Sequence, residues 1–436
     1  MSKIVTLPIE PKDKELEEYL TSYFQAAGYF TERNIIEREA TEVLELDTIL
    51  YDYSAVLPKS ILIEIKSGGW GFPEIFKIFG WKHYLSIDQP VFITSTSKES
   101  KAIDEYYIKK SHEIGVNLVI VKELKNTQLY IKDLIRDTTV EMLDISNWRY
   151  AYWIERKLIK RLISQKKSAQ GVERYKIMAE YYHNINNVAF FTDNILDRLS
   201  DIYKQFQKYS GLTSRVANEI AGVGFECGEI PHDIFTKTFY RCEINDLTTA
   251  TYLEYRSRLS VLKNVCDYII YKRLDPDSEK AKETFKILGY EASKFMLLPS
   301  EMRDRIESLR GHEYIHLYPV FWQWFQWFFG GFILNDYKER EYELFSNKTG
   351  LPIDQIDHAF EAYHIIFPTN SWFVNNSVSN ISSLKMFPPV FMGKGADYRK
   401  KFYTEDNEYN SLTLTKEHTL DDLIRWNNCV VDFLMS

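Results

Sequence analysis

Two charged residues alternate with apolar ones in the run Ile61-Leu62-Ile63-Glu64-Ile65-Lys66. Successive side chains of a strand point to opposite faces, so Glu64 and Lys66 project from one face while the isoleucines enter the core. A second apolar run, Leu46-Asp47-Thr48-Ile49-Leu50, carries one acidic residue. If these two strands pair as a hairpin, the carboxylate of Asp47 comes beside that of Glu64.

This combination of groups suits one kind of chemistry. Two carboxylates at a sheet edge form a hard-oxygen site for Mg²⁺, which prefers carboxylates together with several water molecules. A lysine two residues further on can position or deprotonate a water, or stabilise a phosphoryl transition state. The two strands therefore predict metal-assisted hydrolysis of phosphodiester bonds. An ExK triplet also occurs on solvated sheet faces, and the surrounding elements distinguish the two interpretations.

The rest of the first 125 residues alternates between helical and strand-like segments. We expect a helix that begins near Asp13 and ends at Gly28, further helices at 72–85 and 98–114, and strands at 34–39, 43–51, 60–66, 90–94 and 117–121. Residues 123–130 are a candidate for an additional edge strand. Strands that alternate with helices of about 10 to 15 residues predict an α/β domain around a mixed sheet.

This order of elements resembles the PD-(D/E)XK nuclease core, which has the restriction-endonuclease-like fold. The shared order is an acidic helix, a strand with Asp47, a strand with Glu64-Ile65-Lys66, and then helix, strand, helix and strand. Within this superfamily the chain is most similar to Mrr-type restriction endonuclease domains. That similarity includes Leu16-Glu17 on the first helix and the Ala27-Gly28-Tyr29 that ends it, and it covers about residues 12–122.

The resemblance implies a role for each residue of the motif. Asp47 and Glu64 would bind the catalytic divalent metal, Lys66 would be the catalytic lysine, and Glu17 would complete the site. It further implies a Mg²⁺-dependent endonuclease, with Mn²⁺ as a substitute, that hydrolyses DNA in restriction or antiphage defence. The chain departs from the family in two places. Leu46 precedes Asp47 where the motif commonly has proline, and Glu64 stands where Mrr-type domains often carry glutamine.

Other residues are candidates for the same site. Glu18 lies on the acidic helix, and Glu45 shares a strand face with Asp47, although a solvated strand end also explains Glu45. Lys82 and His83, on the helix after the glycines, are candidates for contacts to substrate phosphates, with simple surface placement as the alternative. Two other activities stay open beside DNA cleavage. One is cleavage of RNA, and the other is nucleic-acid binding by a nuclease fold without catalysis.

The chain changes character after its first third. We expect a PD-(D/E)XK nuclease-like domain at 1–135 and a mainly α-helical region at 144–436, with a further division near residue 275 as an alternative. The helical region would recognise target DNA, sense a trigger or mediate assembly, either as a homo-oligomer or with a separate partner of a defence system. No GxxxxGK[ST] motif occurs, so an NTP-driven motor in this chain is not supported.

A basic stretch opens the helical region. Residues 148–176 contain nine Lys or Arg residues against two Glu. A helical projection places Leu158 and Leu162 on one face. It gathers on the other face Trp153, Arg156, Lys157, Lys160, Arg161 and Lys167. In an acidic protein such a face is typical of a surface that tracks DNA phosphates, and a solvated face or an interdomain contact is the alternative. We expect Arg156, Lys157, Lys160 and Arg161 to contact the DNA backbone.

A second motif points to different chemistry. His312-Glu313-Tyr314-Ile315-His316 matches HExxH, in which two histidines one helical turn apart bind Zn²⁺ in a peptidase. Gly311 stands directly before the motif, and Pro319 soon after it disrupts a helix. These neighbours disfavour the peptidase and favour a histidine pair that packs against aromatic residues.

Composition narrows the class of protein. The chain has 436 residues, 45% hydrophobic and 27% charged residues and a formal net charge of −8. These values exclude a disordered chain and a basic protein that coats nucleic acid non-specifically. Its four cysteines form no CxxC pair, and the longest apolar run, 320–334, is too short for a membrane span. We expect a cytoplasmic protein, with that run as a buried aromatic helix.

Overall fold

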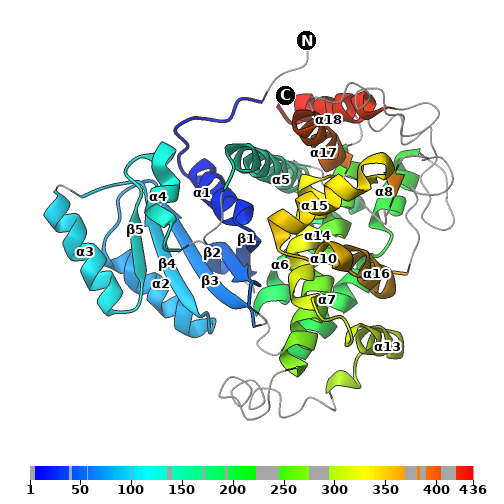
Figure 1. The fold of residues 1–436 in the computed structure, drawn as a ribbon, viewed down its shortest axis with the longest axis horizontal. Coiled ribbons are helices and arrows are strands. Elements are labelled where there is room, and N and C mark those ends of the chain that lie inside the picture. Colours follow the sequence, from blue (N-terminus) through cyan, green and yellow to red (C-terminus); the bar gives the residue numbers. More distant parts are fainter. Residues whose placement is uncertain are drawn as a thin grey trace. The chain divides into compact units, whose positions relative to one another are not determined.

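The computed structural model describes residues 5–38, 42–55, 57–98, 100–134, 140–168, 172–191, 195–221, 245–273, 294–368, 381–382, 389–403 and 419–435. These residues belong to two compact units, Thr6–Trp153 and Ile154–Ser436 (Figure 1). We call them the N-terminal unit and the helical unit. The division falls within helix α5 (Met142–Ser168), which begins near the boundary expected from the sequence.

A five-stranded sheet forms the centre of the N-terminal unit, in the order β1-β2-β3-β4-β5. The strands are β1 (Phe30–Arg38), β2 (Glu42–Asp52), β3 (Lys59–Lys66), β4 (Gln89–Thr94) and β5 (Asn117–Ile120). The pairs β1–β2 and β2–β3 are antiparallel, whereas β3–β4 and β4–β5 are parallel. The mixed α/β sheet expected from the alternating pattern is therefore confirmed.

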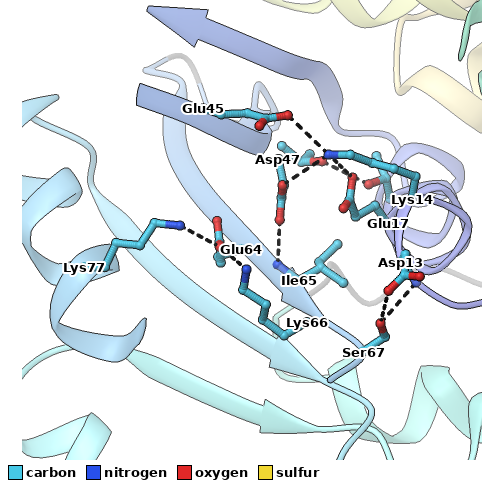
Figure 2. A network of polar contacts seen from close by, with 12 residues as sticks. Asp13, Lys14, Glu17, Glu45, Asp47, Glu64, Ile65, Lys66, Ser67 and Lys77 are labelled. Carbon is cyan, nitrogen blue, oxygen red and sulfur yellow. Dashed lines mark hydrogen bonds and ion pairs between the residues drawn. The ribbon is translucent and has the colours of Figure 1, made fainter. Parts of the chain in front are cut away.

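Helices cover both faces of this sheet. Helix α2 (Phe72–Tyr84) links β3 to β4, and α3 (Lys101–Glu113) links β4 to β5. Because such parallel connections are right-handed, both helices lie on the same face, and the rings of Phe72 and Tyr107 stack at 4.7 Å. Helix α1 (Lys14–Ala26) packs on the other face, where Thr21 Oγ1 lies 3.1 Å from Thr48 Oγ1. Strand β3 thus runs between α1 and α2 (Figure 2).

Helix α1 follows its sequence pattern. Leu16, Leu20, Tyr23 and Phe24 are all buried, as their 3, 4, 7 spacing predicts. The helix ends before Gly28, whose φ of 88° is a left-handed conformation that glycine adopts without strain.

One expected strand is wrong. Residues 123–130 form a short 3₁₀ turn, Leu124–Asn126, followed by helix α4 (Thr127–Ile131). The carbonyl oxygen of Leu124 accepts hydrogen bonds from Tyr19 Oη at 2.7 Å and from Thr127 Oγ1 at 2.6 Å. Because these side chains occupy the carbonyl, it does not pair with a neighbouring strand, and the chain turns into α4.

The described part of the helical unit consists mainly of α-helices. After α5 its described helices are α6 (Glu173–Phe191), α7 (Ile195–Tyr209), α8 (Leu212–Ala221), α10 (Asn245–Lys272), α13 (Ser300–Leu309), α14 (Tyr318–Gln323), α15 (Lys338–Thr349), α16 (Ile356–Ile366), α17 (Pro389–Phe402) and α18 (Leu420–Met435). Helix α10 packs against α6, α7, α8 and α14. A two-stranded sheet joins β6 (Ile333–Leu334) and β7 (Ile381–Ser382).

The long aromatic run is buried, as expected, but it is not one continuous helix. Helix α14 passes into a π-helical turn, Trp324–Phe328, and Gly330 and Gly331 with positive φ end the helical path before β6. The run therefore forms a bent core segment. Among the helices that the structure describes, none combines the length and the apolar composition needed to cross a bilayer.

Candidate active site

The register of the β2–β3 hairpin brings the two predicted metal-binding acids together. Thr48 pairs with Ile63 at the end of the antiparallel ladder, so the next residues, Asp47 and Glu64, lie beside each other. Asp47 Oδ2 accepts a hydrogen bond of 3.0 Å from the backbone N–H of Ile65 (Figure 2). This bond holds the Asp47 carboxylate against β3, next to the position of Glu64.

Two lysines meet at the Glu64 carboxylate. The Nζ atoms of Lys66 and Lys77 lie 3.5 Å and 3.0 Å from Glu64 Oε1. Lys66 shares the strand face of Glu64, as predicted, whereas Lys77 comes from α2, where its ammonium lies 3.9 Å from the ring centroid of Trp81. The second oxygen, Oε2, is buried, and no hydrogen-bond partner reaches it among the described residues. Glu64 itself is only 2% exposed, so this unmatched oxygen is costly unless a cation or proton binds it.

A third lysine joins the acids on the α1 side of the site. Lys14 Nζ lies 3.1 Å from Glu17 Oε2, 3.3 Å from Glu45 Oε1 and 3.8 Å from Asp47 Oδ1 (Figure 2). Lys14 is the first residue of α1, so the start of this helix positions both the lysine and Glu17, one turn later. The arrangement connects the acid from the helix to the acids from the sheet through one ammonium group.

Burial and mutual repulsion raise the pKa values of the acids. Burial, followed by the negative charge of Asp47, raises the pKa of Glu17 to about 7. The same two causes, in the same order, raise the pKa of Glu64, against the attraction of Lys77 and Lys66. Burial lowers the pKa of Lys14, but the charges of Glu17, Asp47 and Glu45 outweigh it, so the pKa is raised. Glu17 and Glu64 therefore bind a proton more readily than free carboxylates do.

These groups fit a hard divalent cation. In the described part of the chain, no three Asp, Glu, His or Cys side chains stand close enough to enclose a metal ion by themselves. Mg²⁺ does not require such a cage, because it is commonly held by one or two carboxylates and keeps several waters. Asp47 and the unmatched Oε2 of Glu64 supply these two carboxylates. A bound cation would also relieve the repulsion from Asp47, which adds to burial in raising the pKa values of Glu17 and Glu64.

The raised pKa of Glu17 predicts a pH-dependent stability. An acid with a raised folded-state pKa binds its proton more tightly in the folded state, so stability falls as pH rises from about 4.5 to about 7. Without metal, Glu17→Gln should therefore reduce the fall in the free energy of unfolding between about pH 5 and about pH 8, by on the order of 3 kcal/mol. Urea unfolding in EDTA at several pH values measures this. Glu45→Gln, which changes a half-exposed partner of the same Lys14, is the control. Identical pH slopes for the wild type and Glu17→Gln would contradict the assignment.

The other residues expected as candidates for this site lie in different surroundings. Glu18 is buried, and its charge acts on Arg149 of α5. Glu45 reaches the site through Lys14 and is half-exposed. Lys82 and His83 occupy the last turn of α2, and the ring of His83 lies 4.5 Å from that of Phe79. Glu45 is therefore the alternative candidate that joins the acidic group.

Sequence reasoning missed Lys14 and Lys77. Lys14 precedes Glu17 by three residues on a helix, a spacing that places two side chains on one face, so a signal for it existed. Lys77 had no local signal, because its contact to Glu64 depends on how α2 lies over the sheet.

The HExxH motif lacks the geometry of a zinc peptidase. Helix α13 ends at Leu309, and the motif lies in turns and in the 3₁₀ segment Ile315–Leu317. His312 and His316 therefore do not lie one turn apart on the face of an α-helix. His312 Nδ1 instead lies 2.9 Å from Tyr318 Oη, and the ring of His316 stacks on Tyr314.

The basic stretch on α5 forms a helix whose apolar face, with Leu158 and Leu162, is buried. Lys160 is exposed, while Arg156 and Lys157 are partly exposed. Two placements differ from the helical projection. Trp153 is buried, with its ring stacked on that of Tyr150 at 6.0 Å, and the guanidinium of Arg161 lies 4.1 Å from the ring centroid of Phe433.

A groove of about 530 Å³ lies away from the carboxylates, between α3 and β5. Its lining combines charges of both signs, including Lys101, Asp104, His112 and Lys122. Asp104 is already matched by Lys122 at 2.9 Å.

Comparisons with family models, with curated proteins and with solved structures find no match for this chain.

Proposed function

We propose that the N-terminal unit is a divalent-metal-dependent endonuclease of the PD-(D/E)XK type that hydrolyses DNA phosphodiester bonds. The observation that carries the proposal is the juxtaposition of Asp47 and Glu64 on paired strands, with Lys66 on the same strand face and in contact with Glu64. The mixed sheet with helices on both faces supports it as the expected surroundings of such a site. The substrate would be DNA, the metal Mg²⁺, with Mn²⁺ as a substitute.

Each residue of the chain has a chemical task in this proposal. Asp47 and Glu64 would hold the ion, which when bound supplies positive charge to the scissile phosphate. Lys66, whose side chain is partly exposed, would stabilise charge that develops on the phosphate or position the attacking water. Glu17, held by Lys14 beside Asp47, would complete the acidic site and orient the attacking water.

Incubation with nucleic acid tests the proposal directly. The purified 436-residue chain is mixed with supercoiled plasmid in Mg²⁺, Mn²⁺ or EDTA, and in parallel with a structured RNA. We expect nicked and linear plasmid in either metal and no product in EDTA. Cleavage of RNA but not of plasmid would mean that the substrate is RNA and not DNA. Absence of cleavage in both metals, together with DNA binding, would favour a nuclease fold that only binds nucleic acid.

A second expectation concerns the way this acidic protein holds DNA. The first 125 residues contain 20 acidic residues against 15 Lys or Arg, so we expect cations outside them to contact the DNA backbone. We propose that Arg156, Lys157 and Lys160 of α5 do so. Arg161, which packs over Phe433, would instead support the helix, a change from the sequence-based expectation that all four contact DNA.

Salt dependence of binding measures these contacts. The triple variant Arg156→Gln/Lys157→Gln/Lys160→Gln should bind DNA more weakly, and its log–log salt slope should flatten by about 0.9 for each phosphate that the protein no longer neutralises. The control removes three exposed charges of the same unit at Lys176, Lys204 and Lys208 and should change the slope less. Equal slopes for the wild type and the α5 variant would show that this helix does not contact DNA.

A further inference from the structure

One lysine lies at the centre of the acidic group. Lys14 Nζ contacts an oxygen of each of three carboxylates, at 3.1 Å from Glu17, 3.3 Å from Glu45 and 3.8 Å from Asp47 (Figure 2). These acids come from two elements, α1 and β2. Three carboxylates around one positive charge are the arrangement of a metal site, but here the ammonium of a lysine occupies the position of the metal.

Hydrogen bonds fasten the start of α1 to the end of β3. Ser67 Oγ accepts a hydrogen bond of 3.1 Å from the backbone N–H of Asp13 and donates one of 2.7 Å to Asp13 Oδ1 (Figure 2). Asp13 has a φ of 50°, a strained conformation for a residue other than glycine, which persists only where its surroundings hold it. Ser67 directly follows Lys66, so these bonds hold Lys14, the residue after Asp13, beside the strand that carries Glu64.

The position of Lys14 is not a helix preference. The N-terminal end of an α-helix carries partial positive charge, which disfavours a cation in the first turn. Lys14 is nevertheless the first residue of α1. Its contacts to the three carboxylates offset this repulsion, so these contacts, and not the helix, account for an ammonium group at this position.

Asp47 directs its two oxygens to two positions. Oδ2 accepts the hydrogen bond from the backbone N–H of Ile65, beside Glu64, whereas Oδ1 lies 3.8 Å from Lys14 Nζ. Many enzymes that cleave phosphodiesters use two metal ions about 3.5 to 4 Å apart, which stabilise the attacking and the leaving oxygen. Glu64, whose buried Oε2 has no partner among the described residues, offers the position of one ion. The ammonium of Lys14 occupies the position of the other.

We propose that Lys14 is a built-in cation that takes the place of a second metal ion, so that the site binds a single divalent ion, held by Asp47 and Glu64. The inference rests on the proposed nuclease function and specifies how many metal ions it uses. Mg²⁺ binds oxygen at about 2.0 to 2.1 Å, whereas Lys14 Nζ lies 3.1 Å or more from each acid. The acids are therefore spaced for an ammonium group. A second ion would be repelled by this charge and would have to displace it.

The number of bound Mn²⁺ ions tests this without catalysis. Calorimetry of the 436-residue chain should give one ion for the wild type and two for Lys14→Met, and paramagnetic resonance should show two spin-coupled ions in that variant alone. Lys14→Arg, which keeps a cation, should bind one, as should the control Lys125→Met, which changes a lysine that is 81% exposed. Adding Glu45→Gln to Lys14→Met should weaken binding of the second ion by about 10-fold to 100-fold, the usual cost of removing a group that supports a metal site.

The outcomes separate this inference from the proposed function. Two Mn²⁺ ions in the wild type, or one in both the wild type and Lys14→Met, would overturn the role of Lys14, while plasmid cleavage would keep the nuclease. One ion in the wild type and two in Lys14→Met, without any cleavage, would support the role of Lys14 and count against hydrolysis. Absence of Mn²⁺ from the wild type would overturn both. Lys14→Gln is a second neutral variant for the same count if circular dichroism shows that Lys14→Met does not fold.

Discussion

Lys66→Ala should lower the rate of Mg²⁺-dependent plasmid cleavage by roughly 10²-fold to 10⁴-fold, the loss typical of removing one preorganised charge or proton-transfer group. Lys66 is the ammonium that the strand itself places beside Glu64, and its partly exposed side chain is accessible to a phosphate. Because it lies at the end of β3 on the same face as Glu64, its removal leaves the apolar core unchanged. The fold should therefore survive, which circular dichroism and thermal unfolding verify.

Three companion variants define the mechanism. Lys125→Ala removes a lysine that is 81% exposed in the same unit and should cleave like the wild type. Asp47→Asn and Glu64→Gln should lose both cleavage and Mn²⁺ binding, the latter measured by calorimetry. Asparagine can still accept the hydrogen bond from Ile65, whereas alanine cannot, so Asp47→Asn separates charge from structure. Wild-type cleavage by Lys66→Ala would refute the proposed role of this lysine.

Glu341→Leu should lower the free energy of unfolding of the helical unit by about 3 to 5 kcal/mol, the cost of leaving a buried charge without its partner. Arg399 of α17 and Glu341 of α15 are both fully buried and form an ion pair, with Arg399 Nη2 3.1 Å from Glu341 Oε2. Arg399 Nη1 also donates a 2.7 Å hydrogen bond to the Phe329 carbonyl oxygen, and the guanidinium stacks on Phe332 at 3.9 Å. Denaturant unfolding measures the loss.

A matched pair of variants identifies the cause. Glu341→Leu/Arg399→Met removes both charges, so it should be much more stable than Glu341→Leu alone, although part of the polar network is lost. Asp201→Asn, in the exposed pair with Lys204, should change stability by about 1 kcal/mol or less. Equal stability of Glu341→Leu and the wild type would mean that the Arg399 charge is compensated by the carbonyl oxygens alone.

Local pattern predicted most of the N-terminal unit. Alternation of apolar and charged residues in 61–66 identified a strand and the face of Glu64 and Lys66, because side-chain direction along a strand has a fixed period. The 3, 4, 7 spacing of α1 identified its buried residues in the same way. The pattern failed at 123–130, where hydrogen bonds from Tyr19 and Thr127 to one carbonyl oxygen turned a strand-like segment into a helix.

Motif spacing was a weaker guide in the helical unit. An HExxH motif binds one metal ion only if an α-helix brings its two histidines to the same face. In this chain the motif lies in turns and a 3₁₀ segment instead. A helical projection of α5 sorted Leu158 correctly but placed Trp153 with the basic residues, although packing buries it. A helical projection depends only on the period of the helix, so it does not show which other elements cover each face.

The sequence by itself determined the strands β2 and β3, the presence of Asp47, Glu64 and Lys66 on them, and the acidic character of α1. Only the tertiary structure decided that Lys14 and Lys77 meet these acids. It also decided that one Glu64 oxygen is buried without a partner among the described residues. The reason is the range of the interactions. Strand and helix periods are set between neighbours along the chain, whereas the partners, burial and pKa of a carboxylate are set by whichever helices pack over the sheet.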